Sequence, residues 1–307
     1  MKIAVLGAGA MGSLYGAKLS ANGKNEVHLI DVWKEHIDAV NSNGLQMEEG
    51  GDVLLYETLK GHTSSEETGV CDLVIVFVKS TVTKTAVESN AAVFGPNTVA
   101  LTLQNGLGNI EQISSVIGAE RVIAGTTAHG ATMLSPGKIR HAGKGKTIIG
   151  ELGGHESDRI RKMAAVLEDA GMETVISGNV LGRVWDKLLV NVGINALTGI
   201  TKLYNGQLLD YPEIEELLEK AVSEGVAVAR AKGIRLGFDD PVAHTKDLCR
   251  ATAANKSSML QDILNGRQTE IDRMNGAIVR EGKALGIETP VNLALTNLIT
   301  YLSRKKK

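Results

Sequence analysis

Three polar side chains, Lys187, Asn191 and Asn195, follow one another at intervals of four residues in an otherwise apolar stretch. This spacing places them on one face of a helix. A buried ammonium and two buried amides all need partners. One interpretation is a structural network, in which Lys187 pairs with a carboxylate and the asparagines join helices. The other is a stripe that offers a cation and amide donors to a small polar substrate.

A second group of polar residues follows further along the chain. Asn255 and Ser258 precede an apolar Met-Leu pair, and Glu270 stands where the next helix is expected to begin. Ser258 is either a helix N-cap or a hydroxyl for binding, and the cap is the commoner role. The helix dipole favours the ionised form of a carboxylate in the first helical turn. Glu270 therefore suits this position whether or not it takes part in the chemistry.

A glycine-rich run, GAGAMG at residues 7–12, follows an apolar, partly β-branched run at 3–6 and precedes a stretch with helical spacing. A strand that gives way to a helix is the context that a dinucleotide-binding loop requires. Gly7 allows the tight turn, Gly9 leaves room for a pyrophosphate, and Gly12 lets the helix pack closely. The phosphates would face unpaired amides at the helix N-terminus. An ordinary strand-to-helix turn is the alternative.

A second strand is expected at 27–30 and ends in Asp31, about where an acidic residue should meet the adenosine ribose. A carboxylate accepts hydrogen bonds from both ribose hydroxyls and repels a 2′-phosphate. Asp31 therefore favours NADH over NADPH. Lys34 and, less readily, His36 could still reach a phosphate from the following helix.

Strand-like and helical patterns alternate through the first part of the chain. Strands are expected at 73–78, 98–103 and 122–126, with an antiparallel excursion at 45–59. Helices are expected at 34–43, 82–93, 110–117 and 157–170. This alternation predicts an α/β fold, with a doubly wound Rossmann-type domain over residues 1–178.

From about residue 179, long helical patterns replace the strands, at 181–197, 214–231 and 269–285. The sequence therefore predicts an all-helical substrate and catalytic domain over residues 179–307.

Composition narrows the class of protein. The 307 residues suffice for two domains, and the net charge of -2 gives no electrostatic reason to expect nucleic acid or a membrane surface as partner. Cys71 and Cys249 are far apart and lack metal-ligand spacing, so we expect a reducing, cytoplasmic setting and no metal. The apolar helices suit a homodimer interface, but they suit an ordinary core equally well.

The motifs taken together resemble the ketopantoate reductase family, also called 2-dehydropantoate 2-reductase. The likeness spans nearly the whole chain. Its motifs are GAGAMG at 7–12, VKS at 78–80, QNG at 104–106, WDKL at 185–188 with Asn191 and Asn195, NKSSMLQD at 255–262, TEID at 269–272 and NG at 275–276. The resemblance implies a Rossmann domain, a helical domain and an active site in the cleft between them. It also implies NAD(P)H-dependent reduction of ketopantoate to D-pantoate, a step toward pantothenate and coenzyme A.

The resemblance also assigns roles to single residues. Lys187 is implied as the catalytic lysine and Glu270 as its acidic partner. Substrate contacts are implied for Asn191, Asn195, Asn255 and Ser258. Cofactor contacts are implied for Gly7, Gly9, Ala10, Met11, Gly12, Asp31, Lys79 and Asn105. The residue types suit this reaction, because negative charge growing on a keto oxygen needs a cation or a proton donor. A partly desolvated lysine can serve as both.

Two alternatives stay open. The first is a reductase of another 2-keto acid or of an imine on the same scaffold. The second is a non-catalytic module that binds NAD(H) to control a partner. The chain departs from the family pattern at one position, since many family members prefer NADPH and carry a basic residue near the end of the second strand, where this chain has Asp31.

Overall fold

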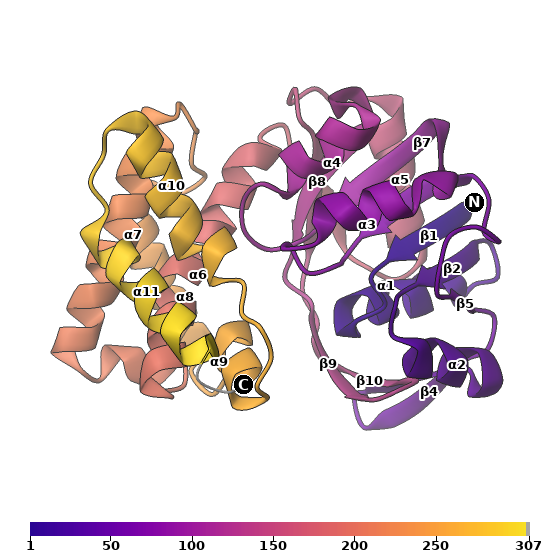
Figure 1. The fold of residues 1–307 in the computed structure, drawn as a ribbon, viewed down its shortest axis with the longest axis horizontal. Coiled ribbons are helices and arrows are strands. Elements are labelled where there is room, and N and C mark those ends of the chain that lie inside the picture. The colour runs from indigo at the N-terminus through magenta and orange to yellow at the C-terminus, as the bar shows by residue number, and fades with distance from the viewer. Residues whose placement is uncertain (305–307) are drawn as a thin grey trace. The chain divides into compact units, whose positions relative to one another are not determined.

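The computed structural model describes residues 1–304, and the chain divides into two compact units (Figure 1). The first unit comprises Met1–Gln104 and Gly108–Val180. The second comprises Asn105–Leu107 and the chain from Leu181 onward. No helix within residues 1–304 is long and apolar enough to cross a membrane.

An eight-stranded sheet forms the centre of the first unit. Its strands are β1 (Lys2–Leu6), β2 (Glu26–Ile30), β5 (Lys60–His62), β6 (Cys71–Val76), β7 (Phe94–Thr102), β8 (Val122–Thr127), β11 (Thr147–Glu151) and β12 (Thr174–Ile176). They lie in the order β12-β11-β8-β7-β6-β1-β2-β5, and all neighbours are parallel except β8 and β11. The direction of strand succession reverses at β1, and such switch points are where α/β sheets bind ligands.

Both faces of this sheet are covered. Ile3 and Val5 of β1 pack in one core with α1 (Ala10–Ser20), α2 (Lys34–Asn43) and α5 (Asp158–Asp169). Ala4 and Leu6 pack in the opposite core with α3 (Thr83–Ser89) and α4 (Asn109–Ile117). A strand buried on both faces is apolar along its whole length, which explains the continuous apolar run of β6. The predicted doubly wound α/β fold is confirmed.

A smaller, four-stranded sheet completes the first unit. It contains β3 (Leu45–Glu49), β4 (Asp52–Tyr56), β9 (Gly130–Ser135) and β10 (Lys138–Gly143), in the order β4-β3-β10-β9. The β3–β4 hairpin is the antiparallel excursion that the sequence predicts. Its parallel pairing with β10 joins segments about ninety residues apart, which no local pattern indicates.

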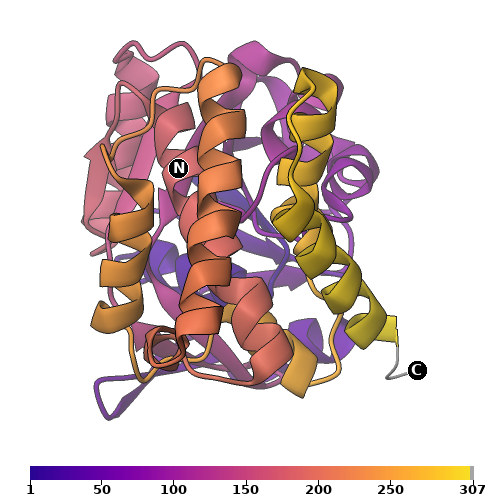
Figure 2. The same ribbon diagram turned by 90° about the vertical axis from the view of Figure 1, so that its left-hand side faces the viewer.

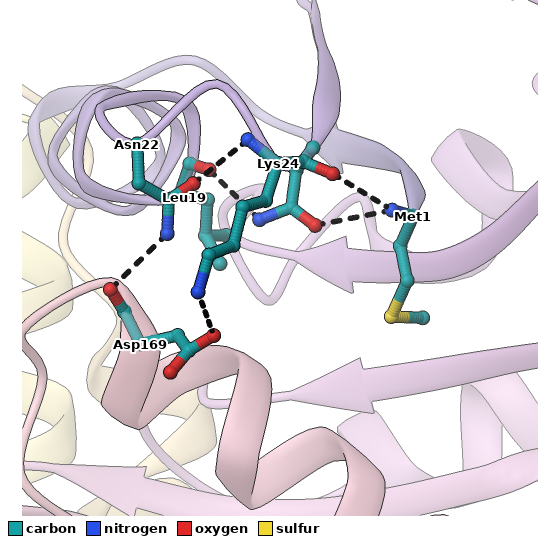
Figure 3. A network of polar contacts seen from close by, with 6 residues as sticks. Met1, Leu19, Asn22, Lys24 and Asp169 are labelled. Carbon is teal, nitrogen blue, oxygen red and sulfur yellow. Dashed lines mark hydrogen bonds and ion pairs between the residues drawn. The ribbon is translucent and has the colours of Figure 1, made fainter.

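The loop between α1 and β2 is joined to the end of α5 by exposed polar contacts (Figure 3). The Lys24 ammonium lies 2.8 Å from Asp169 Oδ2, and Asn22 donates a hydrogen bond to the Asp169 carbonyl at 3.2 Å. The Met1 ammonium donates to the Lys24 carbonyl at 3.2 Å. Because both members of the ion pair are exposed to water, it contributes little to stability.

The second unit is helical and is built around the long helix α6 (Val180–Thr201). The elements after it are the 3₁₀ turn η3 (Gly206–Leu209), α7 (Pro212–Ala231), α8 (Pro241–Ala251), α9 (Ser258–Leu264), the 3₁₀ turn η4 (Ile271–Arg273), α10 (Asn275–Leu285) and α11 (Pro290–Arg304). Helices α7, α10 and α11 pack against one another (Figure 2).

The predicted helix at 269–285 is wrong in its first part. Residues 271–273 form η4, Met274 has a non-helical backbone at φ -109° and ψ -102°, and α10 begins only at Asn275. The reason is tertiary. The Arg273 carbonyl accepts the Leu107 amide at 3.0 Å, and the buried Asn275 side chain donates to the Val192 carbonyl at 3.1 Å. Glu270 therefore precedes a single 3₁₀ turn, and the helix-dipole argument does not apply to it.

Candidate active site

The glycine-rich run connects β1 to α1 as a tight loop. Gly7 has φ +95°, and a Cβ on it would lie 2.5 Å from the Val78 amide nitrogen. A Cβ on Gly12 would lie 1.8 Å from the Gly7 carbonyl oxygen, so neither position accommodates a side chain. Apart from the adjoining residues of the chain, no heavy atom lies within 4 Å of the Cβ position of Gly9, which is the N-cap of α1. Ala10 and Met11 form the first turn of this helix. The open space beside a helix N-terminus fits a dinucleotide pyrophosphate.

Asp31 directly follows β2 and is hydrogen-bonded to the glycine loop. Its Oδ2 accepts the Ala8 amide at 2.7 Å, and its Oδ1 accepts the Trp33 amide at 2.9 Å. Each carboxylate oxygen has a second lone pair, so ribose hydroxyls can still donate to it. Asp31 thus holds the backbone of the glycine loop, a contact that the sequence did not indicate.

The structure corrects one expectation about the 2′-phosphate. His36 is completely buried, and its two ring nitrogens lie 3.1 Å from the Gly137 amide and 3.0 Å from Ser13 Oγ. A side chain held in this way cannot turn toward a phosphate. Lys34 is exposed and pairs with Asp38 at 2.6 Å, so of the two candidates only Lys34 remains available to a ligand.

Lys79 lies exposed in the loop after β6, two residues beyond Phe77, which contacts the Gly7 position. Gln104 holds this loop, because its Nε2 donates to the Val78 carbonyl at 2.6 Å and to Thr83 Oγ1 at 2.8 Å. The sequence did not indicate that Gln104, the first residue of the QNG motif, joins the segments that follow β6 and β7.

Asn105 lies in a different unit from the other residues predicted to bind the cofactor. Residues Asn105–Leu107 belong to the helical unit, where the Leu107 amide donates to the Arg273 carbonyl at 3.0 Å. Gly106 has φ +81°, and a Cβ on it would lie 2.4 Å from that same carbonyl oxygen. The glycine therefore allows the segment with Asn105 to dock beside the turn that follows Glu270.

Lys187 lies on α6 between the buried residues Trp185 and Leu188. Burial of the ammonium lowers the pKa of Lys187 to about 8, and the negative charge of Glu270 acts in the opposite direction. The two residues predicted as the catalytic pair are thus brought into electrostatic contact. A lysine with this pKa is mostly protonated at neutral pH and releases its proton more readily than an ordinary lysine.

Asn195 and Ser258 also come together. Asn195 is 4% exposed, and its Nδ2 lies 3.4 Å from Ser258 Oγ and 3.4 Å from Met274 Sδ. Asn191 lies one turn earlier on the same face of α6 and is half-buried. The predicted stripe is therefore present, and a hydroxyl from α9 meets it.

Ser257, rather than Ser258, caps helix α9. Its Oγ accepts the Leu260 amide at 3.1 Å and lies 2.7 Å from the hydroxyl of Thr198 on α6. Ser258 is the first residue of the helix and is exposed, so the expectation that it serves as the N-cap is wrong. Local patterns could not choose between two adjacent serines, and the contact with Thr198 decides it.

Asn255 lies exposed in the loop before α9, where its amide donates to the Thr252 carbonyl at 2.8 Å and its carbonyl accepts the Asn205 amide at 3.0 Å. Among residues 1–304, no group of three or more His, Cys, Asp or Glu side chains is placed to hold a metal ion.

Comparisons with known proteins agree with this arrangement. The sequence profile described as "Ketopantoate reductase PanE/ApbA" matches residues 3–154, and the profile of its C-terminal part matches residues 179–303. A curated 2-dehydropantoate 2-reductase from Halobacterium salinarum is 37% identical over 304 residues, 99% of each chain. One from Pyrococcus horikoshii is 36% identical over 97% of this chain and 96% of its own.

Solved structures show the same architecture. A D-mandelate dehydrogenase bound to NADH and anilino(oxo)acetate superposes with a TM-score of 0.94 at 31% identity, covering 100% of this chain and 99% of the other. A PanE/ApbA family ketopantoate reductase from Ralstonia eutropha superposes with a TM-score of 0.92 at 33% identity, with the same coverage. With both halves matched by the family profiles and relatives aligned end to end, the chain belongs to the ketopantoate reductase family.

Proposed function

We propose that this protein is a 2-dehydropantoate 2-reductase, which reduces the 2-keto group of ketopantoate to D-pantoate with NAD(P)H. The observation that carries the proposal is the partly desolvated Lys187, whose pKa is lowered to about 8 and which interacts with Glu270. Asn195 and Ser258 supply an amide and a hydroxyl in the same unit. The curated relatives with this activity align over nearly the whole chain.

When bound, the reduced nicotinamide supplies the hydride that the keto carbon accepts. Lys187 donates its proton to the keto oxygen, which gains negative charge during the reaction. Glu270 stabilises the ammonium before that transfer, so the protonated form persists at neutral pH. The amide of Asn195 and the hydroxyl of Ser258 can bind the substrate carboxylate and hydroxyl without adding charge. The product is a 2-hydroxy acid, and solvent returns the proton to Lys187.

A reductase of an aromatic 2-keto acid is the second candidate, because a D-mandelate dehydrogenase has a closely similar structure. The polar character of Asn191, Asn195 and Ser258 supports the first candidate. A hydroxylated substrate can exchange hydrogen bonds with these groups, whereas a phenyl ring offers them neither a donor nor an acceptor.

Absorbance at the reduced-nicotinamide band tests both candidates, with ketopantoate, phenylglyoxylate and a panel of small 2-keto acids as substrates. We expect kcat/KM for ketopantoate to exceed that for phenylglyoxylate by about a hundredfold, the discrimination that a few polar contacts provide. A preference for phenylglyoxylate would establish the second candidate. Binding of NADH without turnover of any keto acid would instead establish a sensing module.

We further propose that NADH is the preferred cofactor. Asp31 supports this, because its carboxylate repels a 2′-phosphate, and so does the burial of His36. Two structures of D-mandelate dehydrogenase with TM-scores of 0.94 and 0.92 contain NADH. The ratio of kcat/KM values for NADH and NADPH measures this preference, and a ratio below one would refute it.

Two further expectations belong to the same proposal. Cys71 and Cys249 are free, buried thiols, which suits a reducing cytoplasm. A homodimer is compatible with the apolar side chains on the surface of α11, among them Leu298 and Tyr301. Light scattering in solution measures the oligomeric state.

A further inference from the structure

Side chains form hydrogen bonds with the peptide groups on both sides of Ala8. Ala8 is the second residue of the glycine-rich run, and its amide donates to Asp31 Oδ2 at 2.7 Å. Its carbonyl accepts the Ser13 hydroxyl at 2.9 Å. The backbone at the centre of the proposed phosphate loop therefore cannot rotate without breaking a hydrogen bond to a side chain.

The Ser13 hydroxyl is in turn held by His36, and the direction of each hydrogen bond follows from the donors. The Gly137 amide can only donate, so His36 Nδ1, at 3.1 Å, accepts. In the neutral ring the proton is then on Nε2, which donates to Ser13 Oγ at 3.0 Å. The single Ser13 proton remains for the Ala8 carbonyl. Each of the three hydrogen bonds therefore has a fixed donor. Gly137 donates to His36, His36 donates to Ser13, and Ser13 donates to the Ala8 carbonyl.

The surroundings keep this arrangement in place. His36 and Ser13 are both completely buried, and the Trp33 ring stacks on the His36 ring at 5.2 Å with an interplanar angle of 19°. Burial lowers the pKa of His36, although the Asp31 charge opposes this, so the ring is neutral as the hydrogen bonds require.

We propose that His36 is a positioning residue for cofactor binding, acting through Ser13 to hold the Ala8 carbonyl so that the amides of the loop stay directed toward the pyrophosphate. Backbone donors that are already fixed in place bind an anion more tightly, because the loop loses no further conformational entropy when the anion binds. The inference rests on the proposed function in one respect, namely that a dinucleotide binds to this loop. Beyond the proposed function, it assigns a role in cofactor binding to His36, which acts through Ser13, and it requires the tautomer of His36 with the proton on Nε2.

Three variants separate this role from a merely structural one. Ser13→Ala removes the hydroxyl. His36→Asn keeps an acceptor near the Nδ1 position for Gly137 but loses the donor to Ser13, whereas His36→Gln can place an amide N–H near the Nε2 position. His28→Asn is the matched control, since His28 is buried on β2 in the same unit and its Nδ1 lies 2.9 Å from His62 Nε2, away from the loop.

The dissociation constant of NADH is measured by fluorescence titration, with kcat at saturating NADH and the thermal midpoint measured in parallel. We expect Ser13→Ala and His36→Asn to raise the NADH dissociation constant by about tenfold, the loss of one buried hydrogen bond, with kcat little changed. His36→Gln should recover most of the affinity, and His28→Asn should leave it unaltered.

The outcomes distinguish this inference from the proposed function. NADH affinities of Ser13→Ala and His36→Asn equal to that of the wild type would overturn the inference while leaving the reductase intact. A lowered thermal midpoint without weaker NADH binding would overturn it too, since it would show a purely structural role. A wild-type protein that binds neither NADH nor NADPH would overturn both proposals.

Discussion

The Glu270 carboxylate raises the pKa of the Lys187 ammonium, while burial lowers that pKa to about 8. These opposed influences keep Lys187 protonated at neutral pH and still able to release its proton. The pair therefore supplies the proton donor that reduction of a keto group needs.

Lys187→Ala should lower kcat by about a hundredfold to ten-thousandfold, the usual contribution of a general acid. NADH affinity should stay near that of the wild type, because the glycine loop and Asp31 belong to the other unit. Steady-state kinetics and NADH titration measure the two effects. A variant that retained its kcat would show that another group donates the proton.

Glu270→Gln should shift the alkaline limb of the pH profile of kcat to lower pH. The protonated lysine is the active form, so the rate falls as pH rises through the pKa of Lys187, at about pH 8 in the wild type. Loss of the carboxylate removes the influence that raises this pKa. Glu281→Gln is the control, because Glu281 pairs with Lys232 on the surface of the same unit. An unmoved limb in Glu270→Gln would contradict the assignment of the pair.

Ser258→Ala should alter substrate binding, whereas Ser257→Ala should alter the stability of the fold. Ser258→Ala should raise KM for the keto acid with little loss of stability, because the exposed hydroxyl contacts Asn195 and caps nothing. Ser257→Ala should lower the free energy of unfolding by about 1 kcal/mol, the usual value of an N-cap. Denaturant unfolding and substrate kinetics on both variants decide this. The reverse pattern would return the cap to Ser258.

Asp31→Asn should raise the ratio of NADPH to NADH kcat/KM by about tenfold, because the charge that repels a 2′-phosphate is lost. The asparagine side chain keeps one oxygen, which can still accept the Ala8 amide, while the hydrogen bond from the Trp33 amide to Oδ1 is lost. Asp38→Asn changes a nearby exposed charge that pairs with Lys34, and it serves as the control. A ratio unchanged by Asp31→Asn but altered by Asp38→Asn would assign cofactor choice to Lys34.

Local sequence patterns predicted the alternation of strands and helices in the first unit, the helical second unit and the glycine-rich loop. The spacing of Gly7, Gly9 and Gly12 after an apolar run predicted the loop, since a tight turn and close packing exclude side chains at two of the three positions. The interval of four residues placed Lys187 and Asn195 on one face of α6, because helix geometry alone fixes the direction of side chains along a helix.

Only the tertiary structure decided which polar groups meet. Contacts between distant segments hold His36 against Gly137 and give the cap of α9 to Ser257, which contacts Thr198. They also delay the start of the helix expected at 269–285 until after Met274. Periodicity records which face of an element is buried, but it carries no information about the partner on the other side. The sequence by itself therefore determined the two-part fold and the residues able to do chemistry, whereas long-range hydrogen bonds decided the individual role of each.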